Sequence, residues 1–346
     1  MPSPAPGAAV TARAPAKVNL LLQVGPRRDD GYHDLLTVFQ ALSLHEDVRA
    51  SLAEGPAGRV RVTGTDGTDV SRVPLDGSNL AVRAVRLLAE RTGTGGALDL
   101  HLHKGVPVAG GMAGGSADAA AALVAADALW GTHLGLEQLG ELAAELGSDV
   151  PFALHGRTAV GTGRGERLVP VMTTATFSWV LVTSPVGLST PAVFREFDRL
   201  TGDGGSDLGD VRRLRAVETA LRAGDPAQLG AALHNDLAEA ALSLAPHLAG
   251  TMEAGRAAGA MAAVVSGSGP TVALLAESPA AAADLAAALT DRHGAQHVRT
   301  ASGPVLGAHV LEAVRATAVT DQGARDAGPA DVRTSPPAPE RSEGDD

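Results

Sequence analysis

The residues best suited to chemistry in this sequence form a glycine-dense loop that leads into an alanine-rich segment. Four of the six residues from Gly110 to Gly115 are glycine, so the backbone can turn tightly and approach a ligand without a side chain in the way. The following residues predict a helix over 116–130, with Ser116 as its N-cap and Asp118 in its first turn. Such a helix directs free N–H groups and the positive end of its dipole at the loop. Loop and helix together predict an anion site suited to phosphate.

Two common phosphate-binding motifs are excluded here. The chain contains no GxxxxGK[ST] sequence, and the loop does not have the GxGxxG spacing of a dinucleotide-binding turn. The alternative is a flexible surface loop that precedes an ordinary helix. We favour the phosphate site because a loop built only for flexibility needs no strong helix start at its end.

Composition excludes several classes of function. With 346 residues and a net charge of −11, the chain is long enough for two domains and is poorly suited to bind nucleic acid, which needs clustered Lys and Arg. The absence of cysteine excludes disulfides, thiolate metal sites and a cysteine nucleophile, and fits a cytoplasmic protein. No apolar run of about 18 residues and no signal peptide is recognisable, so we expect neither a membrane protein nor an exported one.

Lysine is rare in this chain, which makes its two lysines informative. Of 28 basic residues only Lys17 and Lys104 are lysine. Either both remain by chance, or a compact ammonium is needed that a planar guanidinium cannot replace. Residues 10–24 alternate as a strand, which places Lys17 and Asn19 on the same face.

The remaining elements alternate between helix and strand, with no internal repeat. We predict strands over 47–52, 59–63, 97–103, 179–183, 262–275 (interrupted by a glycine turn) and 307–311, and helices over 79–91, 136–146, 212–223, 227–240, 246–258 and 279–289. Residues 156–165 are expected to be a glycine-rich connection. The predicted organisation is a disordered leader (1–10), an N-terminal domain (11–168), a C-terminal domain (169–316) and a disordered acidic tail (317–346).

Several motifs resemble those of a known family. The loop from Pro107 to Ala120 resembles the phosphate-loop signature of the GHMP small-molecule kinases, and Gly267-Ser268-Gly269-Pro270 resembles their third motif. Within that superfamily, three stretches resemble the kinases of 4-diphosphocytidyl-2-C-methyl-D-erythritol: Pro15-Ala16-Lys17-Val18-Asn19-Leu20, Arg28-x-Asp30-Gly31-Tyr32-His33-x-Leu35 and Gly147-Ser148-Asp149-Val150-Pro151-Phe152. The resemblance extends from about residue 12 to residue 315.

The resemblance implies a fold and an activity. The fold is a two-domain α/β (α+β) GHMP-kinase fold, with an N-terminal domain like ribosomal protein S5 domain 2, a C-terminal GHMP-kinase domain and the active site between them. The activity is transfer of the γ-phosphoryl group of ATP to the 2-hydroxyl of the cytidylyl substrate, in the non-mevalonate route to isoprenoids. Mg²⁺ is expected with ATP. Its protein ligands are not identified, although Ser116 is a candidate. We expect a monomer or weak homodimer with a small-molecule substrate and with neither nucleic acid nor membrane as partner.

The resemblance also assigns the catalytic pair. Asp149 is implied as the base that accepts the hydroxyl proton, although spacing alone favours Ser148 or Asp149 as a helix cap before Pro151. Lys17 is implied as the ammonium beside Asp149, where it would stabilise the developing alkoxide. Its alternative is a surface lysine on an edge strand.

Further residues are assigned to the two ligands by the same resemblance. Asn19, Tyr32, His33, Thr190 and Phe194 are implied to bind the cytidylyl substrate, with His33 at the cytosine edge. Without the family, Asn19 would be an outward polar residue, His33 a turn histidine and Phe194 a core residue. ATP is implied to bind along the loop, with Asn79 and Lys104 beside the adenine. The loop residues so assigned are Pro107, Gly110, Gly111, Met112, Ala113, Gly114, Gly115 and Ser116, with Gly267, Ser268 and Gly269 in the third motif.

Two details depart from a simple picture of this site. His101 and His103 alternate on one strand, but no third ligand is spaced to join them, so we interpret them as structural. Asp118 stands where some relatives have asparagine. Its carboxylate would repel phosphate unless it points away or meets a cation.

Two other functions are weighed against this one. A GHMP kinase for homoserine or a mevalonate derivative has no cytosine to recognise, which would leave the Asp30-Gly31-Tyr32-His33 turn and Phe194 without a role. A non-catalytic RNA-binding module is conceivable because the first domain's fold also occurs in ribosomal proteins. The net charge of −11 speaks against it.

Overall fold

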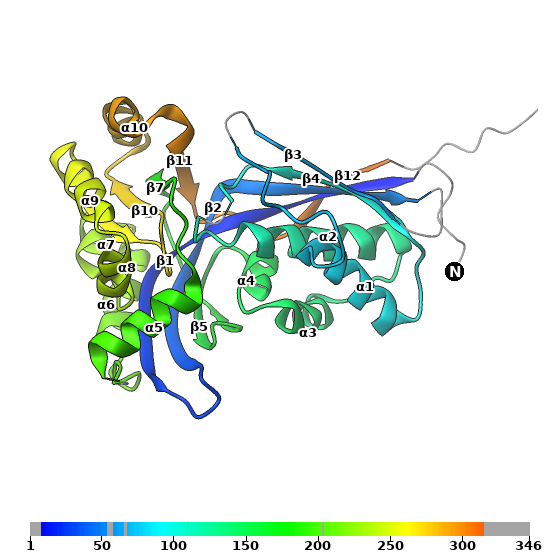
Figure 1. Ribbon diagram of the computed structural model, residues 1–346, viewed down its shortest axis with the longest axis horizontal. Coiled ribbons are helices and arrows are strands. Elements are labelled where there is room, and N and C mark those ends of the chain that lie inside the picture. Colours follow the sequence, from blue (N-terminus) through cyan, green and yellow to red (C-terminus); the bar gives the residue numbers. More distant parts are fainter. Residues whose placement is uncertain (1–7, 54–57, 66–67, 109, 203, 315–346) are drawn as a thin grey trace, which may run out of the picture. The chain divides into compact units, whose positions relative to one another are not determined.

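Two sheets, the first mixed and the second antiparallel, and the helices packed on them position every predicted site residue (Figure 1). The computed structural model describes residues 8–53, 58–65, 68–108, 110–202 and 204–314. The predicted tail and most of the predicted leader therefore lie outside the described residues, although β1 already begins at Ala9. The described residues belong to one compact unit that ends at residue 316, and the proposed division near residue 168 stays a prediction.

The first sheet is built on a long hairpin. Strands β1 (Ala9–Arg27) and β2 (His33–Leu52) are 19 and 20 residues long and pair antiparallel. The main order is β12-β1-β2-β4-β3, with β5 and β6 continuing from the other half of β2 and β8 beside β1. The remaining strands are β3 (Val60–Gly64), β4 (Leu98–Lys104), β5 (Thr158–Gly163), β6 (Arg167–Pro170), β8 (His234–Asn235) and β12 (His309–Val314).

Four helices cover one face of this sheet (Figure 1). They are α1 (Leu80–Thr92), α2 (Gly114–Trp130), α3 (Leu136–Leu146) and α4 (Val150–His155). The central helix, α2, is buried along most of its length, and most of its buried residues are alanine. Because alanine lets helix and sheet approach closely, α2 packs directly against β1 and β2.

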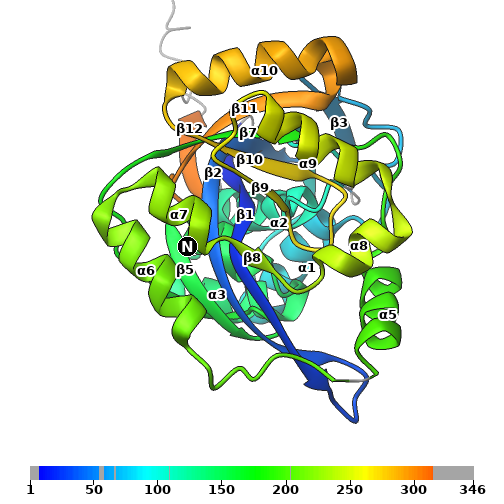
Figure 2. The same cartoon turned by 90° about the vertical axis from the view of Figure 1, so that its left-hand side faces the viewer.

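The second sheet has the order β11-β7-β10-β9 and is antiparallel throughout. Figure 2 looks toward this sheet and its helices. Alternate residues of β7 face opposite ways: Trp179 and Leu181 pack toward β1 and β2, whereas Val180 and Val182 pack against α9 and α10. The strands are β7 (Phe177–Val182), β9 (Ala262–Val265), β10 (Val272–Ala276) and β11 (Val298–Gly303), and the helices are α5 (Thr190–Thr201), α6 (Arg212–Ala223), α7 (Pro226–Ala232), α8 (Ala238–Leu244), α9 (His247–Ala257), α10 (Pro279–His293) and the short 3-10 turn Ala295–His297.

Two sequence predictions about elements are wrong. Residues 156–165 are not only a connection, because β5 pairs with β2 there, and Gly161 leaves room for the ring of Phe39 where a Cβ would lie 2.8 Å from it. The helix predicted over 227–240 is two helices separated by β8. The break lies at Asn235, whose side-chain amide donates to the carbonyls of Val265 and Gly267, each at 2.8 Å.

The start of α2 also differs from the prediction. The helix begins at Gly114, its N-cap is Ala113 at φ 61°, and no side chain caps it. Ser116 is therefore not the N-cap, and Asp118 lies beyond the first turn. Within the described ranges, no helix has the length and hydrophobicity needed to cross a bilayer.

Candidate active site

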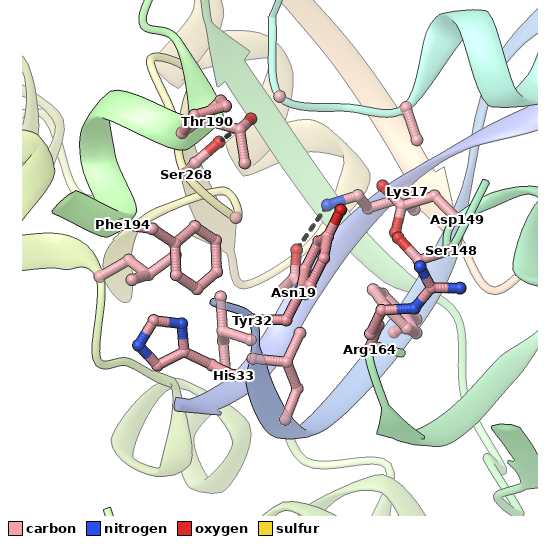
Figure 3. Close-up of a pocket in the computed structure, with 18 of the residues that line it drawn as sticks. Lys17, Asn19, Tyr32, His33, Ser148, Asp149, Arg164, Thr190, Phe194 and Ser268 are labelled. Carbon is pink, nitrogen blue, oxygen red and sulfur yellow. Dashed lines mark hydrogen bonds between the residues drawn. The ribbon is translucent and has the colours of Figure 1, made fainter. Parts of the chain in front are cut away.

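One cavity of about 770 Å³ brings together most of the predicted site residues (Figure 3). Its walls come from the β1–β2 hairpin, the start of α4, helix α5, the turn between β9 and β10 and the loop between β4 and α2, which we call the phosphate loop. The predicted residues that line it are Lys17, Asn19, Tyr32, His33, Gly110, Gly111, Ala113, Gly114, Gly115, Asp149, Thr190, Phe194, Gly267 and Ser268.

A second cavity of about 300 Å³ adjoins the first at the start of α2. Gly114 and Gly115 line both cavities. The second also contains Asn79, Lys104 and Pro107. Three predicted residues, Met112, Ser116 and Gly269, line neither, and Met112 is buried beneath the loop. The N-terminus of α2 therefore lies between two cavities, each large enough for part of a ligand.

Lys17 is a buried ammonium, not a surface lysine on an edge strand. Its side chain is 6% exposed, and its Nζ donates to Asn19 Oδ1 at 2.7 Å. The Asn19 amide donates in turn to the hydroxyl of Thr37 at 2.8 Å, so Asn19 faces inward. Burial lowers the pKa of Lys17, and the negative charge of Asp149 opposes that shift. The lysine and the aspartate are thus close enough to interact through their charges.

Asp149 occupies the N-cap position of α4 but does not cap it with its side chain. The helix has a proline in its first turn, and no side-chain hydrogen bond is made to its free N–H groups. The alternative interpretation of Asp149 as a capping side chain is therefore wrong. Its carboxylate lines the cavity and lies beside Lys17 (Figure 3).

The phosphate loop needs glycine where it passes the third motif. Gly111 has φ +73°, and a Cβ there would lie 2.5 Å from the carbonyl oxygen of Gly269. The loop is also held to β1, because the backbone N–H of Lys17 donates to the carbonyl of Met112 at 3.2 Å. The first N–H groups of α2 have no partner within the helix. The backbone of Lys17 is therefore hydrogen-bonded to the loop that leads into these free N–H groups.

The third motif is shaped to fit around Lys17. Gly267 has φ +58°, and a Cβ at this position would lie 3.0 Å from Lys17 Nζ and 3.3 Å from Asn19 Oδ1. Ser268 and Thr190 share a hydrogen bond of 2.9 Å between their hydroxyls, which joins this turn to the start of α5.

His33 is fixed in orientation at the other end of the cavity. It is 5% exposed, its Nε2 lies 2.8 Å from Asp198 Oδ1, and its ring centroid is 5.2 Å from that of Phe194. Tyr32 is 57% exposed at the rim, with the Arg164 guanidinium 5.8 Å from its ring centroid. Two aromatic rings and an oriented imidazole can hold a flat, polar ring.

Sequence reasoning missed three residues of this arrangement. Asp198 orients His33, Arg164 contacts Tyr32, and Asn235 holds the carbonyl of Gly267. Asp198 could have been found, because it follows Phe194 by one helical turn and shares its face. Arg164 and Asn235 carry no such signal, since tertiary contacts alone bring them to the site.

The two histidines interpreted as structural have hydroxyl partners on β3 and just after it. His101 Nε2 lies 2.9 Å from the Thr63 hydroxyl, and His103 contacts both Thr63 and Thr65. Across the described part of the chain, no three His, Asp or Glu side chains gather as a metal site.

Comparison with known proteins agrees with this geometry. Residues 79–157 match the GHMP kinases N terminal domain, and residues 217–296 match the GHMP kinases C terminal family. A 4-diphosphocytidyl-2-C-methyl-D-erythritol kinase of Kineococcus radiotolerans is 66% identical over 302 residues, which cover 87% of this chain and 92% of that protein. The chain belongs to the 4-diphosphocytidyl-2-C-methyl-D-erythritol kinase family.

Other members of the 4-diphosphocytidyl-2-C-methyl-D-erythritol kinase family and solved structures extend the match. The relative from Nocardia farcinica is 55% identical over 313 residues, covering 90% of this chain and 98% of its own. A crystal structure of 4-(cytidine 5'-diphospho)-2C-methyl-D-erythritol kinase superposes with a TM-score of 0.68 at 34% identity, over 85% of this chain and 99% of the other. A homoserine kinase from Cytophaga hutchinsonii has a TM-score of 0.67 at 19% identity over 88% and 97%, which shows a common fold. The GHMP-kinase fold expected from the sequence is thereby confirmed, and the chain is a kinase that uses ATP.

Proposed function

We propose that this protein transfers the γ-phosphoryl group of ATP to the 2-hydroxyl of 4-diphosphocytidyl-2-C-methyl-D-erythritol. One observation carries the proposal: Lys17 and Asp149, from distant parts of the chain, line the same cavity as the glycines of the phosphate loop. An alcohol placed between the carboxylate and the loop would face both a proton acceptor and the phosphoryl group.

Asp149 is the proposed acceptor of the hydroxyl proton. As the alcohol oxygen bonds to the γ-phosphorus, the bond to the β–γ bridging oxygen breaks, ADP leaves, and the hydroxyl proton passes to the carboxylate. Because an alcohol has a pKa far above 7, the carboxylate mainly orients the nucleophile and takes the proton late. The charge of Lys17 would stabilise negative charge on the reacting oxygens.

The two cavities are assigned to the two ligands. Backbone N–H groups from Gly110 to Ser116, together with the third motif, would hold the ATP phosphates at the mouth of α2. The smaller cavity, with Asn79 and Lys104, would hold the adenosine. The cytidine would lie between Tyr32 and Phe194, with His33 at the cytosine edge and Asn19 and Thr190 nearer the reacting end.

Mg²⁺ fits this site as an ion carried largely by ATP. Of the carboxylates near the loop, Glu46 and Asp118 are engaged by Lys104, and Asp149 interacts with Lys17. Mg²⁺ would therefore be bound mainly by ATP, and the Ser116 hydroxyl is the candidate protein ligand from the sequence, although Ser116 lines neither cavity. When bound, Mg²⁺ would neutralise charge on the transferring phosphoryl group. A monomer or weak homodimer in the cytoplasm remains our expectation.

The test is the choice of acceptor. ATP consumption is measured with the cytidylyl substrate, with homoserine and with mevalonate, and the phosphorylated product is identified by mass spectrometry. We expect turnover with the cytidylyl substrate alone, because homoserine and mevalonate have no cytosine for His33, Phe194 and Tyr32 to bind. Preferred turnover of homoserine or mevalonate would overturn the substrate assignment. Binding of RNA that weakens steeply with added salt would instead favour the nucleic-acid module.

A further inference from the structure

A buried ionic cluster lies directly beneath the phosphate loop. Lys104 at the end of β4 has its Nζ 2.7 Å from Glu46 Oε1 on β2, and it also donates to Asp118 Oδ2 on α2. The three residues are 2%, 0% and 3% exposed, in that order. The carboxylate of Asp118 therefore meets a cation, and Asp118 borders the smaller cavity beside Gly114 and Gly115.

This cluster holds both ends of the loop. At the first end, the N–H of Gly105 donates to Glu46 Oε2 at 2.9 Å. At the far end, Gly114 lies against the same side chain, since a Cβ there would be 2.7 Å from Glu46 Oε1. Asp118, one turn farther along α2, is tied to Lys104. The start of the loop and the start of α2 therefore both contact this cluster of three side chains.

The geometry leaves the Lys104 ammonium little capacity to contact a nucleotide. The carboxyl groups of Glu46 and Asp118 engage it, and its side chain is buried. Burial disfavours the ammonium, but Asp118 and Glu46 outweigh that effect and raise the pKa of Lys104. Lys104 therefore keeps its charge and pairs with the acidic residues of the cluster, although it borders the cavity assigned to adenosine.

The charges in the cluster balance at neutral pH. Burial, followed by the charge of Asp118, raises the pKa of Glu46 to about 8. At pH 7 the coupled carboxyl groups of Glu46 and Asp118 then retain about one proton between them, so the Lys104 ammonium faces about one negative charge. A cluster without net charge does not repel phosphates bound at the N-terminus of α2.

We propose that Glu46, Lys104 and Asp118 are positioning residues that set the phosphate loop against the start of α2, so that Lys104 acts on ATP through the loop and not by contact. The inference rests on the proposed function, because it takes this loop to be the site of the ATP phosphates. Removing one member of a buried ion pair leaves the other charge uncompensated. The members are therefore expected to act as a unit.

The experiment measures binding to the folded full-length protein by calorimetry, with Mg²⁺ present. The variants are Lys104→Met, Asp118→Asn and the double variant, with Arg91→Met as a matched control that removes the exposed Arg91–Glu145 ion pair between α1 and α3. The ligands are ATP, inorganic tripolyphosphate and the cytidylyl substrate. Tripolyphosphate is included because it carries the phosphates without the adenosine.

The proposal predicts parallel losses for the two phosphate ligands. Lys104→Met should lower the affinities for ATP and for tripolyphosphate by the same factor, about tenfold or more. Asp118→Asn should lower both affinities by about threefold. The double variant should be no weaker than Lys104→Met alone, whereas the affinity for the cytidylyl substrate and all affinities of Arg91→Met should stay within about twofold. If Lys104→Met does not fold, the parallel threefold loss in Asp118→Asn decides the question.

Three results would overturn the proposal. They are a loss for ATP but not for tripolyphosphate, which indicates direct contact with adenosine; losses that multiply in the double variant; and an unchanged affinity for both phosphate ligands in Asp118→Asn. Failure of the unmodified protein to bind ATP would instead contradict the proposed function. Binding of ATP without turnover of the cytidylyl substrate would contradict only the choice of acceptor.

Discussion

Replacing Gly267 by alanine should displace the Lys17 ammonium without removing any catalytic group. A Cβ at position 267 would lie 3.0 Å from Lys17 Nζ, so the amine must move by a few tenths of an ångström. Because a misplacement of about 1 Å can cost about 100-fold in rate, we expect kcat to fall by about tenfold. The backbone at φ +58° adds a loss of about 1 kcal/mol in the free energy of unfolding.

Gly93→Ala separates the two effects of that substitution. Gly93 has φ +64°, nearly the same backbone conformation, but a Cβ there meets no atom within 4 Å. Both variants should lose about 1 kcal/mol in denaturant unfolding, while steady-state kinetics should show a lower kcat in Gly267→Ala only. An equal kcat in the two variants would refute the argument that the third motif positions Lys17.

The remaining predictions concern the cytosine end of the cavity and the cluster beneath the loop. His33→Ala should raise the KM for the cytidylyl substrate about tenfold and leave the KM for ATP within about twofold. Asp198→Asn should raise the same KM about threefold, because Asp198 acts by orienting the imidazole. An unchanged KM in His33→Ala would contradict the assignment of His33 to the cytidine pocket. The folded protein raises the pKa of Glu46 from 4.5 to about 8, so the resulting stabilisation is complete below pH 4.5 and is lost as the pH rises to about 8. Thermal unfolding should therefore show a steeper fall of Tm over this range in the unmodified protein than in Glu46→Gln, and identical pH profiles would contradict the assigned shift.

Sequence patterning predicts much of the fold where local signals and packing agree. Helix α3 coincides with the predicted range of 136–146, and α6 coincides with 212–223, because their apolar residues recur at helical spacing. The start of α2 was misplaced because Ala113, and not a residue with a capping side chain, takes the left-handed conformation before it. Strand β5 was missed because its glycines suggest a loop, although Gly161 makes room for the ring of Phe39 and the carbonyl oxygen of Gly165.

The residues that line the cavity were predictable where a motif identifies them. Lys17, Asp149 and the glycines of the loop were all assigned from sequence, and the structure places them around one cavity. What the sequence could not provide is the set of partners that hold these groups. Glu46 lies far in sequence from Lys104, and Asn235 from Gly267, so only the folded chain brings them together.

The central claim is that Asp149, beside Lys17, accepts the proton of the alcohol that attacks ATP. The most direct test is a single-turnover measurement of labelled γ-phosphate transfer to the cytidylyl substrate by Asp149→Asn, with both ligands saturating. Because the carboxylate contributes mainly in the transition state, we expect the transfer rate to fall by about 1,000-fold or more, with the affinities for ATP and substrate within about tenfold. Transfer at the unmodified rate would contradict the account.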